Sequence, residues 1–188
     1  MFGKKNRKPL GLYIHIPFCK SKCDYCDFCS FVPNNKGVVE HYTDALILQM
    51  EDWSSRCRNY NIDSVYIGGG TPTYLDIRRV ARIIDAIYNN FKVDKNAEFT
   101  IECNPATADY EYLRKLRRLG VNRLSIGCQS DSSSHICKLH HREQNKYFHH
   151  YLQKRMLVTR WQVTTLLWKS WIIFLKAQRG RGKRTSKR

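Results

Sequence analysis

Residues 11–31, GLYIHIPFCKSKCDYCDFCSF, are the stretch around which the chain is organised. A short apolar run from Leu12 to Phe18 predicts a strand that leads into a loop. The loop carries four of the eight cysteines of the chain, Cys19, Cys23, Cys26 and Cys29, and the first three are spaced C-x3-C-x2-C. A strand that delivers several thiolates into one loop can hold a metal centre, so the sequence predicts a metal site here.

The spacing of the cysteines bears on the identity of the metal. Three thiolates at C-x3-C-x2-C can bind three irons of a [4Fe–4S] cube and leave the fourth iron open. A structural zinc site with Cys29 as fourth ligand is the alternative, but zinc sites usually pair C-x2-C knuckles that lie far apart. The clustered cysteines and the lack of an apolar signal segment favour a reducing, cytoplasmic location over a disulfide framework.

Charge is distributed unevenly along the 188 residues. The formal net charge is +17, and from Lys138 onward 14 Lys and Arg stand against a single acid, Glu143. Such asymmetry suggests two segments of different character. The most apolar stretch, TTLLWKSWIIFL at 164–175, is interrupted by Lys169 and is shorter than the roughly 18 residues of a membrane span, so no span is expected.

Strand-like and helix-like patterns alternate up to about residue 130. Strands are predicted over 10–17, 62–67, 98–103 and 123–129, and amphipathic helices over 38–58, 76–91 and 108–119. This alternation implies right-handed βαβ crossovers and an α/β fold with a parallel sheet or barrel. In such folds ligands bind at the carboxyl ends of the strands.

Polar or glycine-rich residues follow each predicted strand. The segment GGGTP at 68–72 follows the second strand, Glu102 lies near the end of the third, and Gln129 ends the fourth. Taken singly, a tight turn explains the glycines as well as a ligand does, and Glu102 is as readily a core-edge group as a ligand for an amine or a ribose. Their meeting at one end of a sheet favours a shared binding site.

Four segments together resemble a known family. CKSKCDYC preceded by LYIHIPF resembles the radical S-adenosylmethionine (radical SAM) superfamily. LYIHIPFC, YIGGGTPTYL, IECNP and GVNRLSIGCQS resemble one branch of it, which contains oxygen-independent coproporphyrinogen III oxidases and the HemW heme chaperones. The resemblance covers about residues 10–130 and implies an incomplete parallel (βα) partial barrel that binds a [4Fe–4S] cluster and SAM.

The resemblance also implies roles for individual residues. In the family, three cysteines ligate the cluster, the amino and carboxylate groups of SAM bind the open iron, and an electron from a donor protein allows cleavage of SAM to methionine and a 5′-deoxyadenosyl radical. The residues here that resemble the cluster ligands are Cys19, Cys23 and Cys26. Those that resemble SAM-contacting residues are Tyr13, Tyr25, Gly69, Gly70, Thr71, Glu102 and Gln129, with Arg142 as a displaced match.

The residues after the third cysteine distinguish the two branches. The oxidases have a further cysteine two positions on, whereas Asp27 and Phe28 follow Cys26 here, which resembles the heme chaperones. The resemblance therefore implies binding of heme and its transfer to an acceptor protein, with no catalytic residue assigned. Anaerobic coproporphyrinogen III dehydrogenation is the alternative from the enzyme class.

The segment 131–188 departs from the family pattern. Family members are considerably longer, and the motifs end at Ser130, so we expect a leader over 1–9, the N-terminal part of the barrel over 10–130, and a basic aromatic tail without a family fold. Loss of period and of acidic residues favours out-of-frame translation of the tail. The other interpretation is a zinc-binding or nucleic-acid-binding module. We expect a partial, weakly active product for which nucleic acid is not the partner.

Overall fold

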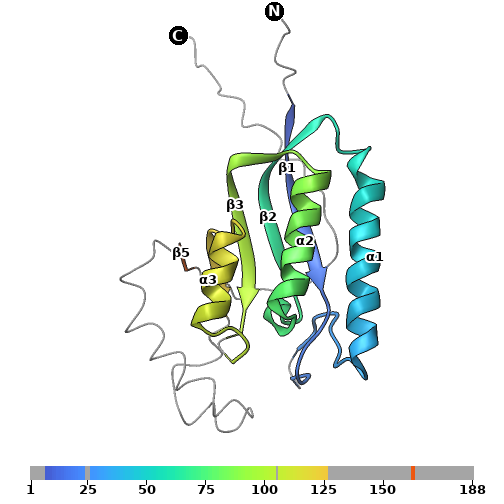
Figure 1. The fold of residues 1–188 in the computed structure, drawn as a ribbon, viewed down its shortest axis with the longest axis vertical. Helices are drawn as coiled ribbons and strands as arrows, with labels where there is room; N and C mark the ends of the chain where they lie inside the picture. Colours follow the sequence, from blue (N-terminus) through green and yellow to red (C-terminus); the bar gives the residue numbers. More distant parts are fainter. Residues whose placement is uncertain (1–6, 24–25, 105, 127–161, 164–188) are drawn as a thin grey trace, which may run out of the picture.

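The computed structural model describes residues 7–23, 26–104, 106–126 and 162–163 (Figure 1). The strands, in order, are β1 (Lys8–Ile16), β2 (Tyr60–Gly69), β3 (Val93–Cys103), β4 (Arg123–Ile126) and β5 (Gln162–Val163). The helices are α1 (Lys36–Ser54), the short 3-10 helix η1 (Pro72–Tyr74), α2 (Ile77–Asn90) and α3 (Tyr110–Arg118). The strands form one sheet in sequential order, and every neighbouring pair is parallel. The predicted α/β architecture is confirmed.

The predicted elements are all present, with shifted ends. The third strand was expected over 98–103, but β3 begins at Val93. The prediction missed its first residues because those at 94–96 are polar and show no apolar alternation. The first helix was expected to run to residue 58 and ends at Ser54. Each α-helix begins after an Asn or Asp whose side chain accepts a hydrogen bond from the first turn, namely Asn35, Asp76 and Asp109.

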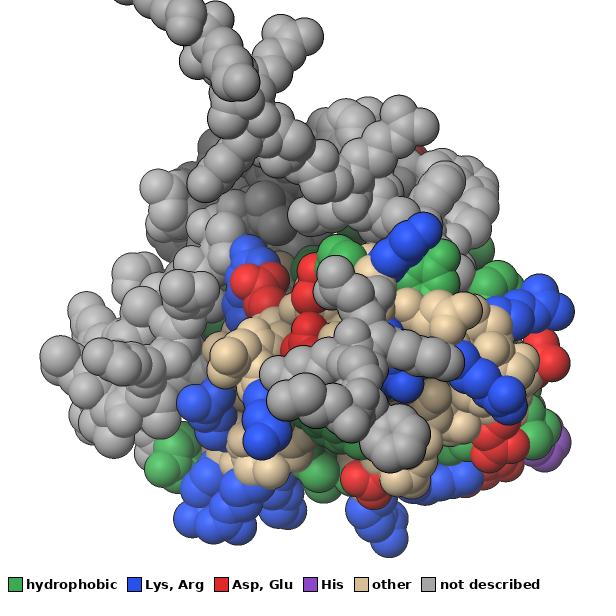
Figure 2. Space-filling view, turned by 90° about the horizontal axis from the view of Figure 1, so that it is seen from above, with side chains coloured by type: hydrophobic (Ala, Val, Ile, Leu, Met, Phe, Trp, Pro, Cys, Tyr) green, Lys and Arg blue, Asp and Glu red, His purple; other side chains and the backbone are tan. Residues whose placement is uncertain are grey.

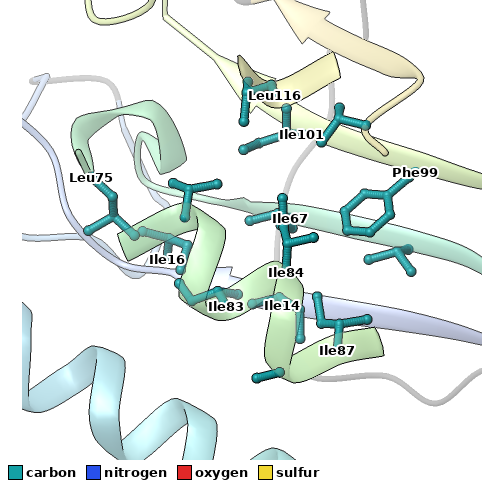
Figure 3. Close-up of a cluster of buried hydrophobic side chains, with 14 of the residues drawn as sticks. Ile14, Ile16, Ile67, Leu75, Ile83, Ile84, Ile87, Phe99, Ile101 and Leu116 are labelled. Atoms are coloured by element: carbon teal, nitrogen blue, oxygen red, sulfur yellow. The ribbon is translucent and has the colours of Figure 1, made fainter. Parts of the chain in front are cut away.

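The hydrophobic core lies between the sheet and the three α-helices. Figure 1 shows α1, α2 and α3 together over one face of the sheet. Strand residues that point to this face, such as Ile14, Ile67 and Ile101, are at most 4% exposed and pack against Ile84 and Leu116 from the helices (Figure 3). The amphipathic pattern of the helices thus dictates which face of the sheet is covered, and it leaves the opposite face to other residues.

The opposite face, here called the inner face, carries polar side chains in register. Tyr13, Tyr66, Thr100 and Arg123 are cross-strand partners in one row over β1 to β4. The next row toward the carboxyl ends pairs His15 with Gly68 and Glu102 with Ser125. Side chains in register on neighbouring strands point to the same side of a sheet, so these rows define one polar surface.

A bulge in β2 determines which residues belong to the inner face. Leu10 of β1 pairs with Ile62, but the next residue, Gly11, pairs with Ser64, so Asp63 is an extra residue in β2. Ile62 and Val65 both point into the core, each 1% exposed, although regular alternation would place them on opposite faces. Because of the bulge, the residues of β2 that follow Asp63 alternate in the opposite sense to those that precede it, and this change occurs before β2 reaches the site.

β5 lies within residues 131–188, for which the sequence predicted no family fold. Arg123 and Leu124 of β4 pair with Gln162 and Val163. A strand edge offers N–H and C=O groups to any extended segment, and two residues are too short to leave a periodic pattern in the sequence.

Within the described residues no helix has the length and apolarity to cross a membrane. Figure 2 shows basic side chains interspersed with acidic ones over the described part of that view.

Candidate functional site

Three loops meet at the carboxyl ends of the strands. The cysteine loop follows β1, the glycine segment follows β2, and Asn104 follows β3. Figure 1 shows the arrowheads of β1 and β3, the cysteine loop and the turn with η1 at the same, lower end of the sheet. The arrangement is the one that the sequence predicted for a binding site in a parallel α/β fold.

The cysteine loop is held at both of its ends. Phe18 and Phe31 form a parallel bridge, in which the N–H of Phe31 donates to Pro17 O at 2.8 Å and the N–H of Cys19 donates to Phe31 O at 3.1 Å. The two phenylalanine rings also contact each other edge to face, with centroids 5.3 Å apart. The loop thus starts and ends at fixed points beside β1, while Cys23 and Cys26 between them remain partly exposed.

The glycine segment packs directly on the first cysteine. A Cβ atom on Gly70 would lie 2.9 Å from the Sγ of Cys19 and 2.7 Å from Phe18 O, so only glycine allows this approach. The Oγ1 of Thr71 donates to the Cys19 sulfur at 3.7 Å. Hydrogen bonds to sulfur are among the interactions that tune a metal-bound thiolate.

The N–H groups of the glycine segment are occupied within the protein. Gly70 donates to Ile16 O at 2.8 Å, Thr71 donates to Phe18 O at 2.7 Å, and Gly69 donates to the Oε2 of Glu102 at 3.0 Å. Glycines in such a segment can also bring N–H groups close to a ligand. Their function in this structure is instead to join the loops that follow β1, β2 and β3.

The chemistry of the cysteine loop suits an iron–sulfur cluster. Cys19, Cys23, Cys26 and Cys29 are not joined in disulfides, and a Cβ on Gly70 would lie 2.9 Å from the sulfur of Cys19. Among the described side chains, which omit residues 24 and 25 of this loop, no three His, Cys, Asp or Glu groups are gathered as a metal site requires. The thiolate chemistry of Cys19, Cys23 and Cys26 suits an iron–sulfur cluster, but these side chains would have to come closer together to bind it.

Glu102 is a buried carboxylate on the inner face beside the glycine segment. Its Oε1 accepts a hydrogen bond from the Tyr66 hydroxyl at 2.7 Å, and its Oε2 accepts the one from Gly69. Burial raises the pKa of this carboxyl, while the two hydrogen bonds and the nearby His15 ring act in the opposite direction. The acceptor capacity that remains on both oxygens is available to a ligand that donates hydrogen bonds.

Two aromatic residues of β1 lie beside Glu102. Tyr13 hydrogen-bonds the Nδ1 of His15 at 3.1 Å, and its ring stacks on that of Tyr66 with centroids 6.0 Å apart. The Nε2 of His15 lies 2.9 Å from Cys29 O, so the histidine connects the inner face to the cysteine loop. Burial and the charge of Glu102 raise the pKa of Tyr13 to about 12.

Sequence reasoning selected Tyr13 and Glu102 but missed His15 and Tyr66. His15 follows Tyr13 by two positions on β1, which is the spacing of residues on one face of a strand, so it could have been found. Tyr66 was hidden by the bulge at Asp63, because simple alternation from Ile62 places it in the core.

The remaining predicted residues divide into two groups. Tyr25, Gln129 and Arg142 lie outside the described residues. Isolated cysteines such as Cys57 and Cys103 are predicted from the sequence to be inert thiols; both are buried in the hydrophobic core, and burial raises the pKa of both.

Comparison with known proteins identifies the family. Residues 13–164 match the radical SAM superfamily, a range that continues past Ser130, where the sequence motifs end. The chain therefore belongs to the radical SAM superfamily. Members of this superfamily use a [4Fe–4S] cluster and SAM.

Individual relatives have two different names. The heme chaperone HemW of Buchnera aphidicola subsp. Schizaphis graminum is 38% identical over 131 residues, which cover 70% of this chain and 35% of the relative. The oxygen-independent coproporphyrinogen III oxidase of Salmonella typhimurium is 34% identical over 141 residues, which cover 75% of this chain and 31% of the relative. The chain thus spans about a third of the length of these relatives.

A solved structure supports the same assignment. Coproporphyrinogen III oxidase (HemN) from Escherichia coli, a radical SAM enzyme, matches with a TM-score of 0.75 and 26% sequence identity. The match covers 85% of this chain and 37% of that structure. The fold of this chain is accordingly the radical SAM fold, and its relatives are proteins of the HemW and HemN type.

Proposed function

We propose that this chain forms the cluster-binding and SAM-binding part of a heme chaperone of the HemW type. The observation that carries the proposal is the packing of Gly70 and Thr71 on the sulfur of Cys19. This contact joins the loops that follow β1 and β2 at the end of the sheet where parallel α/β proteins bind ligands. A simple turn would not require this contact, so the contact favours a binding role for the glycine segment.

The cysteines would ligate the cluster through three thiolates, those of Cys19, Cys23 and Cys26. When bound and reduced, the cluster supplies the electron for cleavage of SAM. The Thr71 hydroxyl would donate to the first thiolate and help to fix its orientation. A one-electron donor protein belongs to this proposal as the source of the electron.

The SAM-binding residues would surround the open side of the cluster. Glu102 would accept hydrogen bonds from an amine or from ribose hydroxyls, because both of its oxygens are already oriented by the protein. The others would line the methionine and adenosine parts of SAM, and they are Tyr13, Tyr25, Gly69, Gly70, Thr71 and Gln129, with Arg142 as a further candidate.

Heme is the proposed cargo, and an acceptor protein is the proposed destination. Two points favour a chaperone over an oxidase, namely Asp27 and Phe28 after Cys26, and the name of the first relative above. Phe28 lies in the cysteine loop and is 40% exposed, so the residue that marks the branch is accessible to a partner. The cytoplasm, a reducing compartment, is the proposed location, in keeping with the free thiols of the described residues.

Anaerobic reconstitution with iron and sulfide tests the proposed cluster. Ser substitutions at Cys19, Cys23 or Cys26 should each remove most of the bound iron, whereas Cys29→Ser, a matched change in the same loop, should retain it. Loss of metal in all four variants, with zinc bound in place of iron, would instead indicate a four-thiolate zinc site.

The reconstituted protein also separates the two functions of the relatives. Anaerobic coproporphyrinogen III dehydrogenation is the second candidate, favoured by the solved oxidase that shares the fold. Heme binding and transfer to an apo-acceptor without conversion of coproporphyrinogen supports the chaperone. Conversion to protoporphyrinogen with consumption of SAM supports the oxidase.

A further inference from the structure

Glu102 on β3 is held by two hydrogen bonds from residues of β2. The phenol of Tyr66 on β2 donates to Oε1 of Glu102 on β3 at 2.7 Å, and Ser125 of β4 lies near the same phenol. The N–H of Gly69 holds the other oxygen at 3.0 Å. One donor on each oxygen fixes both the position and the rotation of the carboxylate.

The ring of Tyr66 reaches Glu102 only because Gly68 has no side chain. Both residues lie on the inner face, two positions apart on β2. A Cβ on Gly68 would lie 2.7 Å from Cε1 of Tyr66 and 3.1 Å from Cδ of Glu102. Gly68 has no positive φ, so the space it leaves, rather than its backbone conformation, is what the contact requires. The first glycine of GGGTP thus leaves room for the ring of Tyr66.

We propose that Tyr66 is a positioning residue: its hydroxyl holds Glu102 so that both oxygens keep a lone pair for a hydroxyl-bearing or ammonium-bearing group of bound SAM. The absence of a side chain at Gly68 leaves the space that the Tyr66 ring needs to reach Glu102. The inference rests on the proposed function, since it takes Glu102 to be a ligand-binding group. It adds a residue that the cysteine and GGGTP motifs do not contain.

The pair Tyr66→Phe and Tyr112→Phe tests the inference in the full-length, cluster-loaded protein. Each variant removes one buried phenol hydroxyl, but that of Tyr112 donates to Leu75 O on the helix-covered side, at 2.8 Å. Tyr66→Phe should weaken binding of SAM about tenfold or more, since hydrogen bonds to charged groups are stronger than neutral ones. Tyr112→Phe should leave SAM affinity unchanged. Iron content and circular dichroism confirm that both variants are folded.

The pH dependence of SAM affinity gives a readout that a general loss of structure would not produce. Donation from Tyr66 favours the ionised form of Glu102, so its removal should raise the pKa of the carboxyl and move the acidic loss of SAM binding to higher pH. The other groups near the carboxyl are His15 and Tyr13 on β1, Ser125 on β4 and Cys103 on the far side of β3. All of these are the same in both proteins, so the difference between the two profiles reports on Tyr66.

The outcomes distinguish this inference from the proposed function. If Tyr66→Phe binds SAM with the affinity and pH profile of the wild type, Tyr66 does not position Glu102, and the proposed function stands. If the wild-type protein binds iron but no SAM, the proposed function fails and takes this inference with it. Gly68→Ala should reproduce the loss seen in Tyr66→Phe, and wild-type affinity in that variant would refute the role of Gly68.

Discussion

Replacement of Gly70 by alanine should disconnect the glycine segment from the cysteine loop. The backbone of Gly70 is not left-handed, so the added methyl group meets no conformational penalty of its own. Its penalty comes from contact, because the Cβ would lie 2.7 Å from Phe18 O, whereas ordinary contacts begin at 3.4 Å. The segment must therefore move away by about 0.7 Å.

A movement of this size should weaken or break two hydrogen bonds. Gly70 N to Ile16 O and Thr71 N to Phe18 O are the bonds that hold the segment on β1 and the cysteine loop. At about 0.5–1.5 kcal/mol each, their loss should lower the free energy of unfolding by about 1–3 kcal/mol. The Cys19 sulfur would also lose its contact with the glycine segment, so we expect a clear loss of iron after reconstitution.

The assay measures iron and sulfide per chain after anaerobic reconstitution, together with the urea midpoint of the apoprotein. Gly11→Ala is the matched control, because its Cβ would meet only the rotatable hydroxyl of Ser64, at 3.1 Å. The control should retain iron. If Gly70→Ala matches the wild type in iron content and in urea midpoint, the reasoning about this contact is wrong.

Two further predictions concern stability. Ile101→Ala removes a completely buried side chain between the sheet and the helices, and it should cost about 2–5 kcal/mol in urea unfolding; a cost below about 1 kcal/mol would show that the core repacks freely. Burial raises the pKa of Tyr42 to about 12 from its ordinary value of 10.0, so the folded state keeps a proton that the unfolded state releases. The contribution of Tyr42 to stability is therefore complete below pH 10 and is lost as the pH rises to about 12, and Tyr42→Phe should flatten the fall of the urea midpoint over that range.

The alternation of strands and helices could be predicted because each element carries its own signal. The apolar run from Leu12 to Phe18 marks β1, and the helical spacing of Val80, Ile84 and Ile87 marks α2, whose buried face contains all three. The carboxyl ends of parallel strands must lie at one edge, so the meeting of the cysteine loop with the glycine segment followed from the fold class alone.

The hydrogen-bond partners at the site could not be predicted in the same way. The motif shows that glycines are needed at 68–70, but it does not show that each serves a different neighbour. Gly68 makes room for Tyr66, Gly69 adopts a φ of 123° against His15, and Gly70 packs on Cys19. Such contacts depend on how β1, β2 and β3 align, and pairing across strands leaves no pattern within any one of them.

The bulge at Asp63 has a consequence for how this site can change during evolution. Upstream of it, β2 follows one alternation, and downstream it follows the opposite one. Loss of that single codon would restore a uniform strand in which Val65 and Ile67 still face the core, while Tyr66 and Gly68 stay on the inner face. Deletion of Asp63 should therefore leave the side chains of the site in place, whereas deletion of Ile67, beyond the bulge, would turn Gly68 toward the core.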